Sequence, residues 1–178
     1  KNISVNKYYS LIYHSISMNS ILEKVKDLKK MALSKNQLIS TAESCTGGLI
    51  SKYLTDIPGS SSFFESSIIS YSNKSKISLL NVNPDTLSNY GAVSEQVVRE
   101  MGLGLLKISS ADIAVSVSGI MGPNSDNTSK KIGSIWICVM NKFKADSNYL
   151  ELSKSRQENR EEAAKIAIMN LYDFISDL

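Results

Sequence analysis

The chain has 178 residues, of which 42% are hydrophobic and 21% charged, and its formal net charge is +3 at pH 7. This balance predicts a soluble globular domain with a sizeable core and no membrane partner, because no apolar run approaches the ~20 residues of a membrane-spanning helix. The basic residues are scattered, so we expect no nucleic-acid partner. Cys45 and Cys138 lie far apart without metal-ligand spacing, so we expect no metal, no disulfide and a cytoplasmic location.

The first residues carry no regular pattern. Residues 1–17 show neither helical nor strand periodicity, and Met18 stands just before a good helix start. We therefore expect an N-terminal extension over residues 1–17 that is non-native or flexible, followed by a domain over residues 18–178. Apolar residues then recur at the spacing of a helix whose lysines form a solvated face: Ile21, Val25, Leu28 and Leu33.

Strand-like and helix-like segments alternate along the rest of the chain. Strands are predicted over residues 37–41, 64–71, 112–118, 133–140 and 149–154. Helices are predicted over residues 48–55, 74–80, a short stretch from Pro84, 94–108 and 159–178, with Asn73 as the expected cap of the second. This alternation predicts an α/β fold, a three-layer α/β/α sandwich.

Residues 41–48, Thr-Ala-Glu-Ser-Cys-Thr-Gly-Gly, lie where a predicted strand becomes a helix. Free backbone N–H groups at such a junction can hold a phosphate or stabilise an oxyanion. Ser44 is the leading nucleophile candidate, and an N-cap serine is the alternative interpretation. Cys45 is either a nucleophile whose thiol pKa the helix start lowers or a small buried residue. Glu43 either orients the loop or complements the helix dipole.

A nucleophile in this chain needs a base other than histidine. The single histidine, His14, lies in the unpatterned N-terminal segment. Lys76 falls in the first turn of a predicted helix, where the helix dipole opposes its charge and burial would lower its pKa. A serine activated by a lysine works without histidine. The alternative is an exposed lysine without a role.

Two further groups are candidates for substrate binding. Ser118 and Gly119 close a hydrophobic strand, the position at which open α/β sheets bind ligands, although an ordinary strand exit has the same pattern. Arg156 and Arg160, four residues apart, form either a two-pronged phosphate clamp or surface ion pairs with the glutamates nearby.

Taken together, these motifs resemble one family, the CinA C-terminal domain, over about residues 21–178. The resemblance rests on the order and spacing of residues 41–48, Tyr71-Ser-Asn73 with Lys76, Gly91-Ala-Val-Ser-Glu95 and Ser118-Gly-Ile-Met-Gly-Pro123. The family includes stand-alone nicotinamide-nucleotide amidohydrolases. The resemblance therefore implies a compact α/β fold and hydrolysis of nicotinamide mononucleotide to nicotinate mononucleotide and ammonia, in pyridine-nucleotide recycling.

The resemblance also implies roles for individual residues. The family's serine nucleophile falls on Ser44 and its lysine on Lys76, with Tyr71 alongside as the third catalytic residue. Its substrate-binding hydroxyl falls on Ser118, and its phosphate-contacting arginine falls on Arg156. The remaining residues expected to bind the substrate are Glu43, Cys45, Thr46, Gly47, Gly48, Gly119 and Arg160.

In the mechanism that we expect, Lys76 takes the proton of Ser44, and N–H groups around Cys45–Gly47 stabilise the oxyanion. The pyridinium ring already activates the amide, so no metal or other cofactor is expected. The expected partners are a small-molecule nucleotide and further copies of the chain in a homo-oligomer.

The chain departs from the family pattern in two loops. The family's glycine-rich acidic loop, which ends in Lys-Pro-Val-Gly-Thr, is replaced by residues 124–134, and its Phe-Pro-Gly-Asp-Arg segment is replaced by Leu-Ser-Lys-Ser-Arg at residues 152–156. The Ser44 and Lys76 pair is kept, so the departures concern substrate affinity and loop geometry. Two other functions stay open, namely a non-catalytic nucleotide-binding or competence-associated protein and a cysteine hydrolase that uses Cys45.

Overall fold

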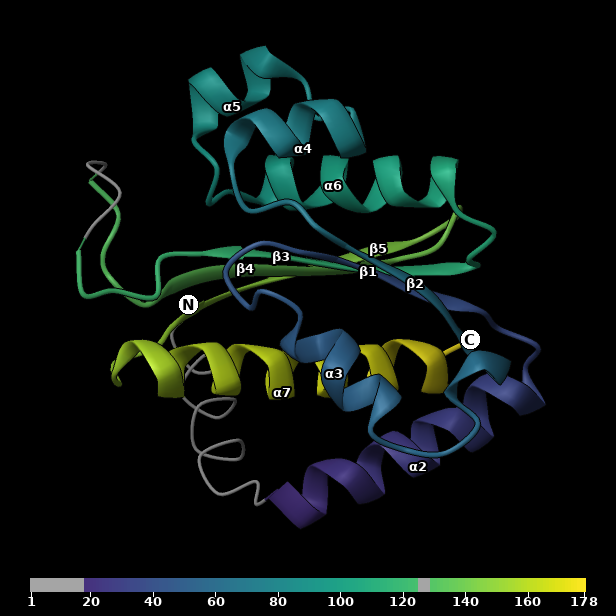
Figure 1. Ribbon diagram of the computed structural model, residues 1–178. Helices are drawn as coiled ribbons and strands as arrows, with labels where there is room; N and C mark the ends of the chain where they lie inside the picture. Colours follow the sequence, from purple (N-terminus) through teal and green to yellow (C-terminus); the bar gives the residue numbers. More distant parts are fainter. Residues whose placement is uncertain (1–17, 125–128) are drawn as a thin grey trace, which may run out of the picture.

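A computed structural model describes residues 18–124 and 129–178, so the predicted extension over residues 1–17 lies outside the described residues. A five-stranded sheet lies between two layers of helices (Figure 1). The three-layer α/β/α sandwich predicted from the alternation of strands and helices is therefore confirmed.

The sheet has the strand order β2-β1-β3-β4-β5. β1 pairs in parallel with both β2 and β3, whereas β4 is antiparallel to β3 and to β5. The carboxyl ends of β2, β1 and β3 therefore meet at one edge of the sheet, the place where such sheets bind ligands. The strands are β1 (Ile39–Glu43), β2 (Phe64–Ile69), β3 (Ile113–Gly119), β4 (Ser134–Met140) and β5 (Ala145–Glu151).

Helices cover both faces of the sheet and bury a core on each side (Figure 1). One face carries α2 (Met18–Ser34), α3 (Leu49–Thr55) and α7 (Arg156–Ser176), with the short η1 (Ser60–Ser62) nearby. The other face carries α4 (Asn73–Leu80), α5 (Pro84–Tyr90) and α6 (Glu95–Ile108). The apolar stripe predicted for the last helix is buried in the larger core: Ala163, Ile166, Ala167, Leu171, Phe174 and Ile175.

Several predicted boundaries were wrong. The cap of α4 is Ser72, whose Oγ accepts the Ser75 N–H at 3.1 Å, so Asn73 is the first helical residue. α7 begins three residues earlier than predicted, because Ser155 caps it in a capping box. β5 begins at Ala145, where edge-strand exposure hides the usual apolar signal. Of the apolar residues at helical spacing in α2, Ile21, Val25 and Leu28 are fully buried, whereas Leu33 is 47% exposed.

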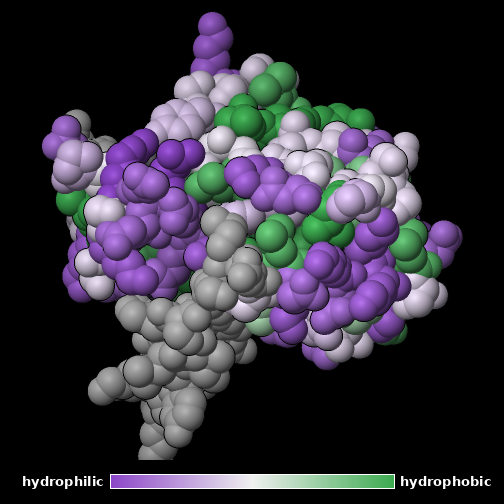
Figure 2. Space-filling view, turned by 60° about the horizontal axis from the view of Figure 1, so that its bottom comes forward, coloured by the Kyte–Doolittle hydropathy of each residue, from purple (hydrophilic) through white to green (hydrophobic). Residues whose placement is uncertain are grey.

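The lysines of α2 form the solvated face that the sequence predicts. Lys26 pairs with Glu23 at 2.7 Å and Lys30 pairs with Asp27 at 3.2 Å, and all four side chains are exposed. Figure 2, turned to bring the lower side of Figure 1 forward, shows hydrophilic and hydrophobic residues interspersed. No helix within the described ranges is long and apolar enough to cross a membrane.

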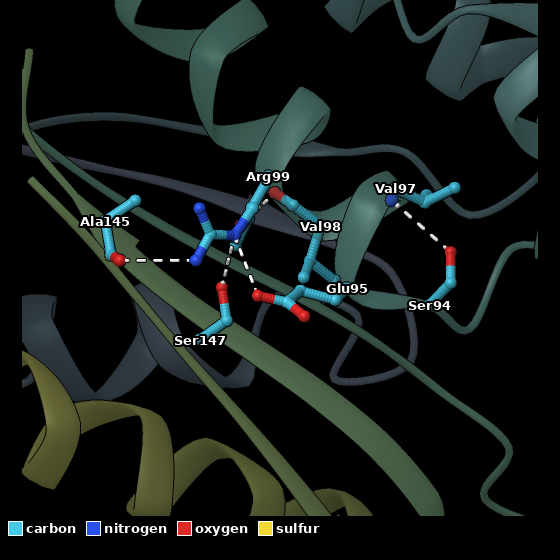
Figure 3. Close-up of polar contacts among 8 residues, drawn as sticks. Ser94, Glu95, Val97, Val98, Arg99, Ala145 and Ser147 are labelled. Carbon is cyan, nitrogen blue, oxygen red and sulfur yellow. Dashed lines mark hydrogen bonds and ion pairs between the residues drawn. The ribbon is translucent and has the colours of Figure 1, made fainter.

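α6 is tied to the edge strand β5 through Arg99 (Figure 3). Arg99 Nε donates to Glu95 Oε1 and to Ser147 Oγ, both at 3.0 Å, and Nη2 donates to the carbonyl oxygen of Ala145 at 3.4 Å. Ser94 Oγ caps the helix by accepting the Val97 N–H at 3.3 Å. These contacts fix the start of α6, and with it the residues that precede the helix.

A glycine lets α6 contact the end of α4. A Cβ at Gly104 would lie 1.8 Å from the carbonyl oxygen of Leu80, so no larger residue fits there without a shift of the backbone. α4 carries Lys76, and its close packing on α6 holds that lysine above the carboxyl edge of the sheet.

Candidate active site

The loops that follow β1, β2 and β3 line a cavity of about 560 Å³ at the carboxyl edge of the sheet. Ser44 follows β1, Tyr71 follows β2 and Ser118 ends β3, so the parallel topology brings three predicted site residues together. The other lining residues are Cys45, Asn73, Lys76, Leu87, Ser88, Gly91, Ala92, Val93, Gly119, Ile120, Met121, Gly122, Asn124 and Arg156.

Ser44 and Lys76 form a buried pair at the bottom of this cavity. Lys76 Nζ lies 2.9 Å from Ser44 Oγ, 2.8 Å from the carbonyl oxygen of Ser70 and 3.4 Å from that of Tyr71. The lysine is only 1% exposed and the serine 7%. Burial disfavours the ammonium form and lowers the pKa of Lys76 from 10.5 to about 8.

This geometry suits a neutral lysine that acts as a base. A neutral amine has two N–H groups and one lone pair. The carbonyl oxygens of Ser70 and Tyr71 can accept the two N–H groups, which leaves the lone pair for the hydroxyl proton of Ser44. The pair can therefore generate a serine nucleophile without histidine.

The carboxylate of Glu43 accepts hydrogen bonds from the free N–H groups at the start of α3. Its side chain is fully buried. Oε2 accepts from Thr46 Oγ1 at 2.6 Å and from the N–H groups of Gly48 at 2.9 Å and Ile50 at 3.2 Å, and Oε1 accepts the Ser51 N–H at 2.8 Å. The carboxylate therefore occupies the free N–H groups of the helix start, which the sequence suggested for a phosphate or an oxyanion. Glu43 is not among the residues that line the cavity, and its role is to shape the turn.

Replacing Glu43 by glutamine is expected to lower the free energy of unfolding by roughly 2–3 kcal/mol, because an amide nitrogen would face N–H donors and the helix start would lose its negative partner. Urea unfolding measures this loss. Glu23→Gln, on the exposed face of α2, is the control and should change the free energy by less than about 0.5 kcal/mol. A loss at Glu43 as small as that of the control would contradict the assigned role.

Of the residues Cys45–Gly47, around which the sequence predicts the oxyanion donors, Cys45 is the one that lines the cavity. The Gly47 N–H donates to the carbonyl oxygen of Ser44 at 3.1 Å, which removes it from the expected set. Within the described ranges, neither the Cys45 N–H nor the Thr46 N–H donates to an oxygen acceptor, and both act on the Cys45 thiol, where they lower its pKa against the larger effect of burial. Thr46 and both glycines lie outside the cavity lining and act on the shape of the turn.

Cys45 lies beside the pair, but its thiol is held in the protonated form. The side chain is 4% exposed, and burial raises the pKa of the thiol to about 12. The lowering of this pKa expected at a helix start is outweighed by desolvation. The protonated thiol is a poor nucleophile, which favours Ser44 over Cys45.

The two arginines occupy different places. Arg156 Nη2 donates to Tyr71 Oη and Nη1 donates to the carbonyl oxygen of Gly122, both at 2.7 Å, on the cavity wall. Arg160 donates instead to the carbonyl oxygens of Cys45 and Thr46 and does not line the cavity. The predicted two-pronged clamp therefore reduces to Arg156, although both arginines line a separate shallow hollow beside Leu49.

Among the described residues that line the cavity, the charged ones are Lys76 and Arg156, and both are basic. A cavity of this kind favours an anionic ligand. The hydroxyl of Tyr71 binds Arg156, and no hydrogen bond within the described ranges joins it to Ser44 or Lys76. No cluster of His, Cys, Asp or Glu side chains that could hold a metal occurs in residues 18–124 and 129–178.

Sequence reasoning missed the wall opposite Ser44, formed by α5 and the residues before α6. Leu87, Ser88 and the run Gly91-Ala92-Val93 line the cavity there. Lys130 Nζ donates to the carbonyl oxygens of Tyr90 and Val93, which fixes this wall from the β3–β4 connection. The sequence motif at residues 91–95 was the available signal, but its spacing alone assigns no chemical role.

The fold and the site define an α/β/α protein in which a buried serine–lysine pair faces a cavity lined by basic charge. The model of the CinA C-terminal domain matches residues 22–175, and the chain belongs to this family. The structure of a CinA superfamily protein from Klebsiella pneumoniae covers 89% of this chain and 99% of that chain, with a TM-score of 0.86 and 25% identity. A competence/damage-inducible protein from Agrobacterium tumefaciens has a TM-score of 0.83 and 32% identity, over 88% of this chain and 95% of that chain.

Curated relatives carry different names. A nicotinamide-nucleotide amidohydrolase PncC from Enterobacter agglomerans is 53% identical over 103 residues, which are 58% of this chain and 63% of that protein. A CinA-like protein from Endomicrobium trichonymphae is 43% identical over 139 residues, which are 78% of this chain and 32% of that protein. The chain spans about a third of the length of several relatives that it matches.

Proposed function

We propose that this chain hydrolyses the carboxamide of nicotinamide mononucleotide to nicotinate mononucleotide and ammonia. The observation that carries the proposal is the buried Ser44–Lys76 pair, with 2.9 Å between Nζ and Oγ, inside a cavity that also contains Arg156. The relative named nicotinamide-nucleotide amidohydrolase supports this choice of substrate.

The first half of the proposed reaction forms an ester between substrate and enzyme. Neutral Lys76 takes the proton of Ser44 as Oγ attacks the carboxamide carbon. The negative charge that develops on the carbonyl oxygen is stabilised by the N–H group of Cys45, a residue that lines the cavity. The C–N bond then breaks, and ammonia leaves with the proton returned by Lys76.

The second half releases the product. Water attacks the ester carbon while Lys76 again takes a proton, and the bond to Ser44 Oγ breaks to give the carboxylic acid of nicotinate mononucleotide, which releases its own proton to the solvent. The proton held by Lys76 returns to Ser44 Oγ, so the enzyme is regenerated without a cofactor. Both cysteines are free and buried, which is consistent with the cytoplasmic location that we propose for this reaction.

Arg156 is proposed to bind the substrate phosphate at the cavity wall. Its guanidinium is oriented by Tyr71 Oη and the carbonyl oxygen of Gly122 and retains N–H donors for a phosphate. Ser118, 1% exposed at the end of β3, is proposed to bind the substrate with its hydroxyl.

Ammonia release from the purified chain tests the proposal. We expect turnover of nicotinamide mononucleotide and at least about tenfold lower kcat/KM for nicotinamide riboside, which lacks the phosphate. Arg156→Gln should raise KM for the mononucleotide by about tenfold or more and leave the riboside nearly unaffected. A wild-type chain that the mononucleotide stabilises against heat without ammonia release would instead be a nucleotide-binding protein.

A further inference from the structure

Arg160 holds the nucleophile turn from the face of the sheet opposite Lys76. It lies on α7, below the sheet in Figure 1, whereas Lys76 lies on α4 above it. Its Nε donates to the carbonyl oxygen of Cys45 at 3.2 Å, and its Nη2 donates to that of Thr46 at 2.9 Å. Two successive carbonyl groups of the turn are thus directed toward α7.

Peptide planarity converts this contact into an orientation of the turn's amides. In a trans peptide the C=O and N–H groups point in opposite directions. Because the carbonyl of Cys45 points to Arg160, the N–H of Thr46 in the same peptide points away from α7. The same contact keeps two carbonyl oxygens, which would repel a developing anion, turned away from Ser44.

Gly47 leaves room for the guanidinium of Arg160 against the turn. A Cβ at Gly47 would lie 3.0 Å from Arg160 Nη2, whereas a Cβ at Gly48 would meet Ile69 Cδ1 at 3.3 Å and makes no close approach to Arg160. Both glycines have positive φ angles, +59° and +95°. Substitution of either glycine is therefore expected to strain the backbone, but only a side chain at residue 47 would also contact the guanidinium.

We propose that Arg160 is a positioning residue, which holds the carbonyl oxygens of Cys45 and Thr46 toward α7 so that neither faces the negative charge that develops beside Ser44. This inference rests on the proposed amidohydrolase function and replaces the expectation that Arg160 binds substrate. Arg160 touches neither Ser44 Oγ nor the cavity, and it acts through the backbone of residues 45–47.

The split between kcat and KM tests this role. Arg160→Gln is expected to lower kcat for nicotinamide mononucleotide by about 30-fold to 100-fold, because a carbonyl oxygen released toward Ser44 would repel the developing anion and weaken binding of the transition state. KM should change less than about threefold, and Arg160→Lys should recover only part of kcat, because it lacks the planar fork. An unchanged kcat, or a raised KM alone, would overturn the proposal.

A reaction independent of the natural substrate separates this inference from the proposed function. Phenylmethanesulfonyl fluoride transfers its sulfonyl group to Ser44 Oγ, with fluoride leaving and Lys76 taking the serine proton. Intact mass spectrometry follows the labelling of the wild-type chain and of Arg160→Gln. Slower labelling of the variant supports the positioning role even if the mononucleotide yields no ammonia, and equal rates would refute it.

The two glycines provide a matched stability control. Gly47→Ala should lower the urea midpoint less in the Arg160→Gln background than in the wild-type background, because the contact between the new Cβ and the guanidinium is then removed. The loss caused by Gly48→Ala should be the same in both backgrounds. Equal losses for Gly47→Ala in the two backgrounds would show that Arg160 does not press on the turn.

Discussion

Replacement of Ser44 by alanine is expected to lower kcat/KM for ammonia release from nicotinamide mononucleotide by about 10⁴-fold or more, because the covalent route loses its nucleophile. The small change in volume at a residue that lines an open cavity should leave the fold and the binding of the mononucleotide intact. Ammonia is measured by a coupled assay and binding by the shift of the thermal midpoint.

Cys45→Ala is the matched control for that experiment. Its thiol lies next in the chain and lines the same cavity, but its pKa of about 12 keeps it protonated. We expect a loss in kcat/KM of less than about tenfold, from packing alone. Retained activity in Ser44→Ala with loss in Cys45→Ala would reverse the assignment and identify a cysteine hydrolase.

Replacement of Lys76 by methionine is expected to lower kcat/KM by about 10³-fold or more and to remove its main pH dependence. For the wild-type chain, log kcat/KM should rise with unit slope toward pH 8 and level off above it, because the neutral amine is the active form. A wild-type profile that falls as pH rises from 7 to 9 would contradict a neutral lysine base.

The same lysine makes stability depend on pH in a direction that can be measured. Its pKa is about 8 in the folded chain and 10.5 when unfolded, so between these values the unfolded chain binds more protons and stability rises with pH. The free energy of unfolding of the wild-type chain, relative to Lys76→Met, should therefore increase by on the order of 3 kcal/mol from pH 7 to above pH 10. Urea unfolding of both proteins across this range measures the change.

Much of this architecture follows from residues that are neighbours in the chain. The alternation of strands and helices predicts the sandwich, and buried runs such as residues 113–118 predict its central strands. The motifs predict that Ser44 and Lys76 belong to one site. Their separation of 2.9 Å depends on β1 and β2 pairing in parallel, which no local pattern specifies.

The sequence left the role of Glu43 open between shaping the turn and binding substrate, and it did not predict that Arg160 binds the backbone of the turn, because both roles depend on where the side chains point. A glutamate beside a helix start and an arginine beside a phosphate-binding arginine have the same sequence pattern whether they face the ligand or the backbone. In the structure both side chains bind the turn itself, one through its N–H groups and the other through its carbonyl oxygens.

The carboxylate of Glu43 at the start of α3 also influences the orientation in which a substrate binds. Because it already neutralises the positive end of that helix, the positive charge at the nucleophile end of the cavity is that of Lys76, which is lost as the pH rises through the lysine pKa of about 8. The permanent positive charge left for a phosphate is that of Arg156, at the cavity wall beside Tyr71. When Lys76 is neutral, the active form, this difference in charge favours one orientation for a molecule with an uncharged amide at one end and a phosphate at the other, with the amide toward Ser44.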